Sequence, residues 1–360
     1  MPKLVALVFS ATLAIAQSHA TSHVIWVMTD GLRTEEVFSG ADISLMSKEN
    51  HVSESSHTKK DFWRETQTAR RSALLPFFWN VIVQKGQSFG NRALGSDVMA
   101  TNGFNISYPG YNESLTGESD DRINSNDKVN NPNTTLLEWL NQKPAFHGRV
   151  AAFAAWDAFP YILNAERADF TVNAGYDAFK GLPGNSQIQL LNALKAESPR
   201  DWAEEPFDHL TFHTALEYLK QKKPRVLFMS LGETDDWAHD GKYGEYLSAA
   251  HRVDDYLKTL WETIQQMPEY RGSTTLVFST DHGRGQGEEW RMHGRGTPDS
   301  KYTWLAFMGP DTPALGERSN VVPVLQTQVA ATIAALLGEN YQRSRPRAGA
   351  PVAGVVGVRK

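Results

Sequence analysis

Three short apolar runs that lead into acidic residues restrict the fold of this 360-residue chain more than any other feature. They are "HVIWVMTDG" (23–31), "RVLFMSLGETDDWAH" (225–239) and "TLVFSTDHGRG" (275–285). Continuous runs of this kind, rich in β-branched and aromatic residues, predict buried strands. Ligands bind outside the carboxyl ends of the strands in open α/β sheets, so these aspartates lie where binding and catalytic residues are usually found.

Helical patterns separate the predicted strands along the chain. Further strand-like runs are 97–103, 149–159 and 303–309. Helical spacing of apolar residues is found at 70–86 (with a kink or restart at Pro76), 134–143, 187–197, 212–223, 246–267 and 326–338. Parallel strands need such crossover helices, so the alternation predicts one α/β domain with a mostly parallel central sheet and helices on both faces.

Charge and cysteine content exclude several classes of function. The 36 basic and 41 acidic residues give a formal net charge of −5, which argues against binding to a nucleic-acid polymer. The chain has no cysteine, so disulfides, thiolate metal sites and cysteine nucleophiles are excluded.

The N-terminus has the pattern of a secretory signal peptide. Lys3 is followed by the apolar stretch "LVALVFSATLAIA" and then by small residues. We expect residues 1–20 to be removed by cleavage after Ala20, with Ala16 as the alternative site. Since no later run has 18 or more uninterrupted apolar residues, we expect no membrane span after cleavage and a periplasmic or secreted protein.

The mature chain is predicted to hold one functional domain, residues 21–342. Residues 40–66 are polar and weakly patterned, which favours an insertion over the surface. Residues 343–360 are rich in Arg, Pro and Gly, and we expect a poorly ordered tail there.

Histidines accompany the aspartates at the predicted strand ends. The set consists of Asp30, Asp235 or its neighbour Asp236, His239, Asp281, His282 and His293. Carboxylates crowded at one rim repel each other unless cations compensate them. Three aspartates and three histidines suit two zinc ions or a similar pair, and two such ions form the clamp used for displacement at phosphorus. The four-residue step to His239 favours Asp235 over Asp236.

Ser107 is the candidate nucleophile. It follows a predicted strand, and Pro109 suits the first turn of a helix. A hydroxyl at a helix N-terminus is close to backbone N–H groups and to the positive end of the helix dipole, which favour an alkoxide and a bound phosphate. The alternative is a serine that only caps the helix.

In order along the chain, "VMTDG", "SYPG", "DDWAHDG", "TDHGRG" and "MHGRG" resemble the alkaline phosphatase superfamily. The resemblance is closest to its nucleotide pyrophosphatase/phosphodiesterase and bacterial phosphatase-like branches. It implies a single alkaline-phosphatase-like domain with two divalent ions, Zn²⁺ being favoured and Mn²⁺ the alternative. Asp235, His239 and His293 would hold one ion. Asp30, Asp281 and His282 would hold the other, together with Ser107.

The resemblance also implies the reaction. Ser107 would attack a small-molecule phosphate ester and form a covalent phosphoseryl intermediate, with Asn126 binding the substrate. A serine stands where the diesterase branch often has threonine, and Tyr111 stands where sulfatases usually have arginine, so a sulfatase is disfavoured. Aromatic residues near the motifs favour diesters slightly over monoesters. A phosphomonoesterase, a relative of phosphoglycerate mutase and a non-catalytic metal-binding protein remain alternatives.

Four arginines near the motifs are further candidates for contacts with the phosphate oxygens. They are Arg33, Arg122, Arg284 and Arg295. Charge develops on the equatorial oxygens during displacement at phosphorus and needs preorganised donors. For each of these arginines, a solvated or structural role is favoured over a contact with substrate.

Overall fold

The computed structural model describes residues 20–53 and 57–357. The expected signal peptide therefore lies outside the described residues, except for Ala20. Both candidate cleavage positions remain predictions. No helix in the described part of the chain is long and apolar enough to cross a membrane.

An eight-stranded sheet forms the centre of the molecule, in the order β10-β2-β9-β7-β1-β6-β4-β5. Seven of these strands run in one direction and β9 runs against them. The strands are β1 (His23–Thr29), β2 (Gln87–Phe89), β4 (Val150–Ala154), β5 (Thr171–Ala174), β6 (Val226–Leu231), β7 (Thr274–Thr280), β9 (Leu305–Met308) and β10 (Gly316–Glu317). The prediction of a mostly parallel α/β sheet is confirmed.

The register of the three central strands explains why their ends meet. β1 pairs in parallel with both β6 and β7, and Thr29 is the partner of Leu231 on one side and of Thr280 on the other. All three strands therefore end at the same level. The residues that follow them must emerge along one edge of the sheet.

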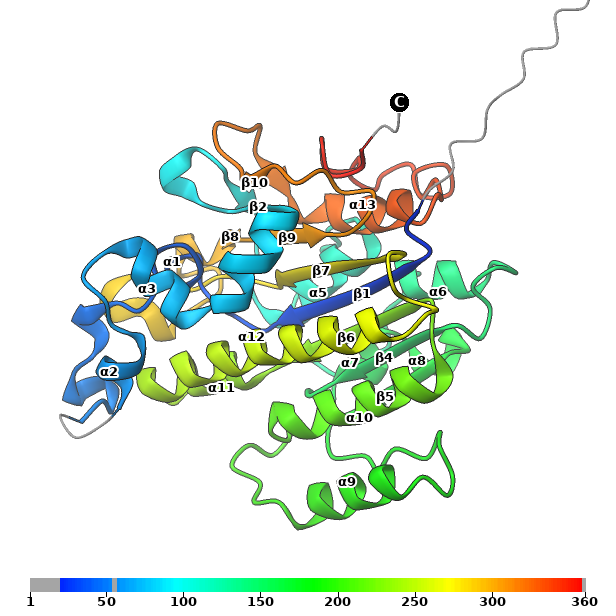
Figure 1. The fold of residues 1–360 in the computed structure, drawn as a ribbon, viewed down its shortest axis with the longest axis horizontal. Helices are drawn as coiled ribbons and strands as arrows, with labels where there is room; N and C mark the ends of the chain where they lie inside the picture. Colours follow the sequence, from blue (N-terminus) through cyan, green and yellow to red (C-terminus); the bar gives the residue numbers. More distant parts are fainter. Residues whose placement is uncertain (1–19, 54–56, 358–360) are drawn as a thin grey trace, which may run out of the picture.

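Helices cover both faces of the sheet (Figure 1). One layer includes α10 and α12, and the other includes α5, α6, α7 and α13. The helices are α1 (Thr34–Ser39), α2 (Thr58–Phe62), α3 (Gln67–Leu74), α4 (Val83–Lys85), α5 (Ser107–Thr116), α6 (Leu136–Asn141), α7 (Phe159–Ile162), α8 (Ala165–Ala168), α9 (Ser186–Glu197), α10 (Asp208–Lys222), α11 (Glu233–His239), α12 (Tyr243–Gln266) and α13 (Val329–Leu336). Along β1, Ile25 and Val27 face the first layer, and Val24, Trp26 and Met28 face the second. This is the alternation expected of a strand buried on both faces.

A small second sheet, in the order β11-β3-β8, lies beside the main one. Its strands are β3 (Val98–Met99), β8 (Tyr302–Thr303) and β11 (Val324–Leu325). The strand predicted over 97–103 is therefore real but only two residues long.

The helix predicted over 70–86 is interrupted near Pro76, as the sequence suggested. α3 ends at Leu74, a π-helical turn spans Phe78–Ile82, and α4 follows. The N–H groups of Phe77 and Phe78 donate to the buried Asp254 carboxylate, at 2.6 and 2.7 Å. Asp254 on α12 thus satisfies backbone donors that the interrupted helix leaves open.

Segment 40–66 differs from the expected surface loop. Its described part contains α2 and two short 3₁₀ turns, Ile43–Leu45 and Lys48–Asn50. Leu45, Val52 and Phe62 are buried in the core beneath the first helix layer. The sequence pattern did not reveal these three buried side chains, because they are too widely spaced to give the period of a helix or a strand.

The expectation of a poorly ordered tail after residue 342 is wrong for residues 343–357. Ala348, Val352 and Val355 are buried in the same cluster as α13. The Val352 N–H donates to Thr332 Oγ1, at 2.8 Å. A few apolar side chains among prolines and glycines are sufficient to dock this segment against the last helix.

Candidate active site

The ends of β1, β6 and β7 bring the predicted ligands to one edge of the sheet. Asp30 directly follows β1, and Asp281 and His282 directly follow β7. After β6 the chain enters α11, a short helix that the sequence reading did not predict. Asp235 and His239 are four residues apart on α11, so both project from one face of it.

A buried group is formed by Asp30, Asp281 and His282, whose ligand atoms lie within 4.8 Å of one another. His282 Nε2 lies 3.2 Å from Asp30 Oδ1 and 3.5 Å from Asp281 Oδ2. Asp281 and His282 are completely buried, and Asp281 Oδ2 has no hydrogen-bond partner among the described residues. A buried carboxylate oxygen without a donor is costly, and a cation bound by these three side chains would compensate it.

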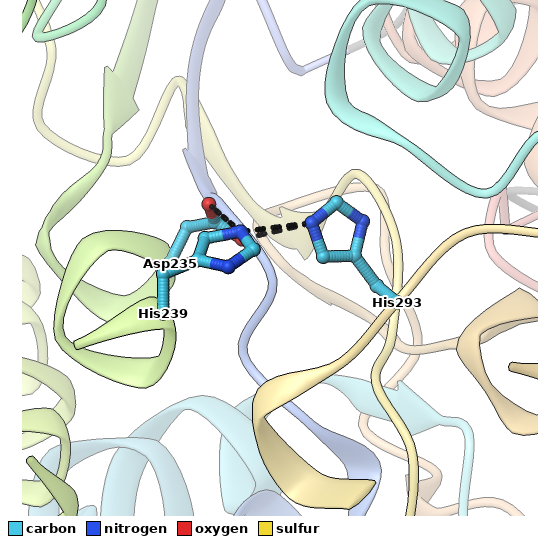
Figure 2. Close-up of side chains that lie close together, drawn as sticks. All are labelled: Asp235, His239 and His293. Carbon is cyan, nitrogen blue, oxygen red and sulfur yellow. Dashed lines mark hydrogen bonds and ion pairs between the residues drawn. The ribbon is translucent and has the colours of Figure 1, made fainter. Parts of the chain in front are cut away.

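An open group is formed by Asp235, His239 and His293, also within 4.8 Å. His239 Nε2 lies 3.1 Å from Asp235 Oδ2 and 3.0 Å from His293 Nε2. Figure 2 shows the His239 and His293 imidazoles pointing toward each other, with the Asp235 side chain beside His239. Two ring nitrogens and a carboxylate that converge on one point fit a divalent cation such as zinc.

The backbone selects the tautomers of two histidines. His282 Nδ1 is 2.9 Å from the Gly283 carbonyl oxygen, and His293 Nδ1 is 3.1 Å from the Asn105 carbonyl oxygen. A carbonyl can only accept, so a neutral ring carries its proton on Nδ1 and keeps the Nε2 lone pair for a ligand. The two rings also stack, with centroids 4.1 Å apart.

Ser107 lies next to the buried group. Its Oγ is 3.4 Å from both Asp30 Oδ1 and His282 Nε2. Ser107 is the first residue of α5, while Ile106 occupies the N-cap position and has no side-chain group that could cap the helix. The alternative of a serine that only caps the helix is therefore wrong.

Residues behind the buried group hold its two carboxylates, Asp30 and Asp281, in place. The Tyr111 hydroxyl donates to Asp30 Oδ2 at 3.1 Å and accepts from Ser230 Oγ at 2.8 Å. The Gly31 N–H donates to Asp281 Oδ1 at 3.0 Å. Sequence reasoning did not find this role for Tyr111, although its position one turn after Ser107 on a helix places both on one face.

The electrostatics of the site reflect this crowding. Burial and the neighbouring Asp30 carboxylate raise the pKa of Asp281. Burial lowers the pKa of His282, but Asp281 and Asp30 outweigh it and raise that pKa to about 9. Burial and His282 lower the pKa of His293. Crowding of the carboxylates thus favours positive charge at the buried group, and the open group offers a neutral imidazole; both features suit a cation.

Asp236 belongs to neither group of three. Burial, followed by the Asp30 charge, raises its pKa to about 8. Its Oδ2 is buried and has no hydrogen-bond partner among the described residues. The geometry therefore favours Asp235 as the ligand, as the four-residue step to His239 suggested.

Asn126 lies beside the start of α5. Its Oδ1 accepts the N–H of Tyr108, the residue after Ser107, at 3.0 Å. The side-chain amide nitrogen of Asn126 is therefore left as a donor. This contact occupies one N–H of the first turn, and Pro109 has none. The position is compatible with substrate binding by Asn126, which remains a prediction.

The four candidate arginines are placed differently. Arg33 is buried and paired with Glu36, and Arg122 is exposed and paired with Asp120. Arg284 is buried against Asp235. Arg295 is exposed, and its guanidinium lies 4.1 Å from the centre of the Phe104 ring.

A cavity of about 640 Å³ opens close to the N-terminal end of α5. It is lined by Phe104, Ile106, Asp121, Asn124 and Arg295. Ile106 immediately precedes Ser107 in the chain, so the cavity opens near the start of α5. By contrast, Tyr108 and Tyr111 are buried and cannot serve as open platforms for a substrate.

Comparisons with known proteins agree with this geometry. A family model described as type I phosphodiesterase / nucleotide pyrophosphatase matches residues 42–293. No curated protein matches the sequence.

Solved structures match almost the whole chain. The alkaline phosphatase PafA gives a TM-score of 0.60 at 11% identity, over 94% of this chain and 99% of that one. Ps i-CgsB gives 0.57 at 16% identity, over 92% and 75%. The lipoteichoic acid synthase LtaP from Listeria monocytogenes gives 0.55 at 10% identity, over 95% and 75%. At these identities the likeness shows the fold alone, which is alkaline-phosphatase-like.

Proposed function

The chain belongs to the type I phosphodiesterase / nucleotide pyrophosphatase family, and we propose that it is an exported hydrolase of phosphate diesters with a two-cation site and a serine nucleophile. Membership of this family identifies an enzyme that hydrolyses phosphate esters. One observation carries the finer proposal: Ser107 Oγ lies 3.4 Å from two members of the buried group. The open group adjoins that group, since His282 Nε2 is 3.8 Å from Asp235 Oδ1.

We assign one divalent cation to each group. Asp30, Asp281, His282 and the Ser107 hydroxyl would hold one, and Asp235, His239 and His293 would hold the other. Zinc suits the nitrogen and oxygen ligands best, with Mn²⁺ as the alternative. When bound, the cations lower the pKa of the Ser107 hydroxyl and neutralise charge on the phosphoryl oxygens.

The reaction on the protein side is a double displacement. Ser107 Oγ loses its proton and forms a bond to phosphorus while the bond to the leaving alcohol's oxygen breaks. That oxygen takes up one proton, so the alcohol leaves and no net proton is consumed. Water next attacks the phosphoseryl ester and releases Ser107 as a hydroxyl. The Asn126 amide would donate to a phosphoryl oxygen throughout, which is the preorganised contact that such a transition state rewards.

The surroundings of Ser107 favour a diester over a monoester. The extra charge of a monoester rewards an arginine clamp, but Arg33, Arg122 and Arg284 are each paired with a carboxylate. The second organic group of a diester could instead lie in the cavity beside Phe104 and Ile106. Arg295 in the same cavity is the one observation that favours a phosphomonoesterase as the second candidate.

Export follows from the signal-peptide pattern of residues 1–20 and is part of the proposal. It would place the enzyme in the periplasm or outside the cell. There it would meet small phosphate esters rather than the substrates of glycolysis. This location disfavours the phosphoglycerate mutase alternative.

A paired assay tests the proposal. The mature protein is incubated with a p-nitrophenyl diester and with p-nitrophenyl phosphate, and its zinc and manganese contents are measured on the same sample. We expect faster release of nitrophenol from the diester and two metal ions per chain. Hydrolysis that is unaffected by removal of the metals with a chelator would contradict the two-cation site, and a faster monoester reaction would favour the second candidate.

A further inference from the structure

Arg284 is a fully buried arginine in direct contact with the open group. Its Nη2 donates to Asp235 Oδ1 in a close ion pair. The same guanidinium donates to three backbone carbonyls, those of Gly31, Asp235 and Arg291. A guanidinium has five N–H donors in a rigid fork, so these contacts fix its position.

The oxygen that Arg284 holds lies between the two groups. Asp235 Oδ2 faces His239 at 3.1 Å and so points into the open group. Asp235 Oδ1 is 3.8 Å from His282 Nε2 in the buried group and 3.9 Å from His293 Nε2 in the open group. A carboxylate oxygen at this position could bridge two cations if nothing else bound it.

The Gly31 backbone lies so close to Arg284 and Asp235 that a side chain at this position would clash with both. Gly31 has φ +59°, and a Cβ there would lie 2.8 Å from both Arg284 Nε and Asp235 Oδ1. Glycine is therefore required sterically as well as conformationally. Arg33 supports the same loop, since its Nη1 donates to the Gly285 carbonyl at 3.0 Å.

The positive charge of Arg284 also affects how the site attracts a phosphate ester. Two divalent cations carry four positive charges, and the three aspartates of the two groups carry three negative ones. The Arg284 guanidinium adds one positive charge, so the occupied site has a net charge of +2 (4 − 3 + 1). A negatively charged phosphate ester is attracted more strongly than it would be without the arginine.

We propose that Arg284 is a positioning residue that keeps Asp235 Oδ1 from bridging the two cation groups and so reserves the space between them for a phosphoryl oxygen. The inference rests on the proposed two-cation function. It assigns to this arginine a role in phosphate binding without direct contact with the substrate. Asp235 remains a ligand of the open group through Oδ2.

Zinc content and inorganic phosphate binding together test this role. The variant Arg284→Met removes the charge and the donors, Arg284→Lys keeps the charge but cannot reach both Asp235 and Gly31, and Arg291→Met is the control. Arg291 lies in the same region, but its side chain donates to Glu49 O and Asn50 Oδ1. Each protein is loaded with zinc, and the Kd for phosphate is measured by calorimetry.

We expect Arg284→Met to keep the zinc content of the unsubstituted protein, because Asp235, His239 and His293 remain. It should bind phosphate at least about tenfold more weakly, because a positive charge is lost and Asp235 Oδ1 is released. Arg284→Lys should be intermediate, and Arg291→Met unchanged. If Arg284→Met does not fold, Arg284→Lys serves as the test. Its Kd for phosphate should then be at least about threefold higher than that of the unsubstituted protein.

Two results would overturn this inference but leave the proposed function intact. One is two zinc ions in the unsubstituted protein together with an unchanged phosphate Kd in both Arg284 variants. The other is loss of zinc from Arg284→Met, which would make Arg284 an ordinary support of the metal ligand. Absence of zinc binding by the unsubstituted protein would instead overturn the proposed function itself.

Discussion

Replacement of Tyr111 by phenylalanine tests the support of the buried group. Tyr111 is almost completely buried, and its hydroxyl donates to Asp30 Oδ2 at 3.1 Å. The variant keeps the ring but leaves Asp30 Oδ2 without this donor. An unsatisfied buried acceptor costs about 1–3 kcal/mol. At about 1.4 kcal/mol for each factor of ten, this corresponds to roughly a 5- to 150-fold change in an equilibrium constant.

We therefore expect Tyr111→Phe to bind zinc at the buried group about 10- to 100-fold more weakly, the range seen when outer partners of metal ligands are removed. Zinc affinity is measured by competition with a chromophoric chelator. The matched control is Tyr341→Phe. Tyr341 is equally buried, and its hydroxyl donates to the Thr116 carbonyl at 3.1 Å, with no metal candidate in contact.

The control separates loss of a buried hydrogen bond from loss of ligand support. Both variants should lose comparable stability in urea denaturation, but only Tyr111→Phe should lose zinc affinity. A zinc Kd of Tyr111→Phe within about twofold of that of Tyr341→Phe would refute the reasoning, because the expected range lies well above it.

Three further predictions concern other parts of the account. Ser107→Ala should lower kcat by at least about a thousandfold with nearly unchanged zinc content, because the covalent step is lost while Asp30, Asp281 and His282 remain as ligands; normal turnover would show that water attacks phosphorus directly. Asp235→Asn should lose one zinc ion in metal analysis and Asp236→Asn neither; the reverse result would exchange their roles. Burial lowers the pKa of His23 from 6.5 to about 4, so the unfolded chain binds the extra proton. The free energy of unfolding should thus fall by up to about 3 kcal/mol between pH 6.5 and 4. Urea titrations should show a smaller pH dependence in His23→Asn, and an identical slope would contradict the assignment.

The central sheet could be predicted because its strands are buried on both faces. Such strands consist of continuous apolar runs, and those at 23–29, 226–231 and 274–280 needed no other signal. Short strands such as Gln87–Phe89 and Thr171–Ala174 were missed. Three or four residues give too little pattern, and their pairing depends on neighbours far away in the sequence.

The convergence of the candidate ligands on one edge of the sheet was predictable for a similar reason, whereas their division into two groups was implied by the family resemblance. Asp30 and Asp281 follow strands that end level with each other, and the four-residue step to His239 identifies the partner of Asp235. The roles of Tyr111 and Arg284 were not predictable from single positions. Each depends on a contact across the sheet edge, Tyr111 with Asp30 and Arg284 with Asp235, and a sequence pattern does not record such contacts.

The most direct test of the central claim is the stereochemical course at phosphorus. A phosphorothioate diester of known configuration is hydrolysed in isotopically labelled water, and the configuration of the product is determined. Attack by Ser107 followed by attack of water inverts phosphorus twice, so the account predicts overall retention. Overall inversion would show a single direct attack by water and would contradict a covalent intermediate on Ser107.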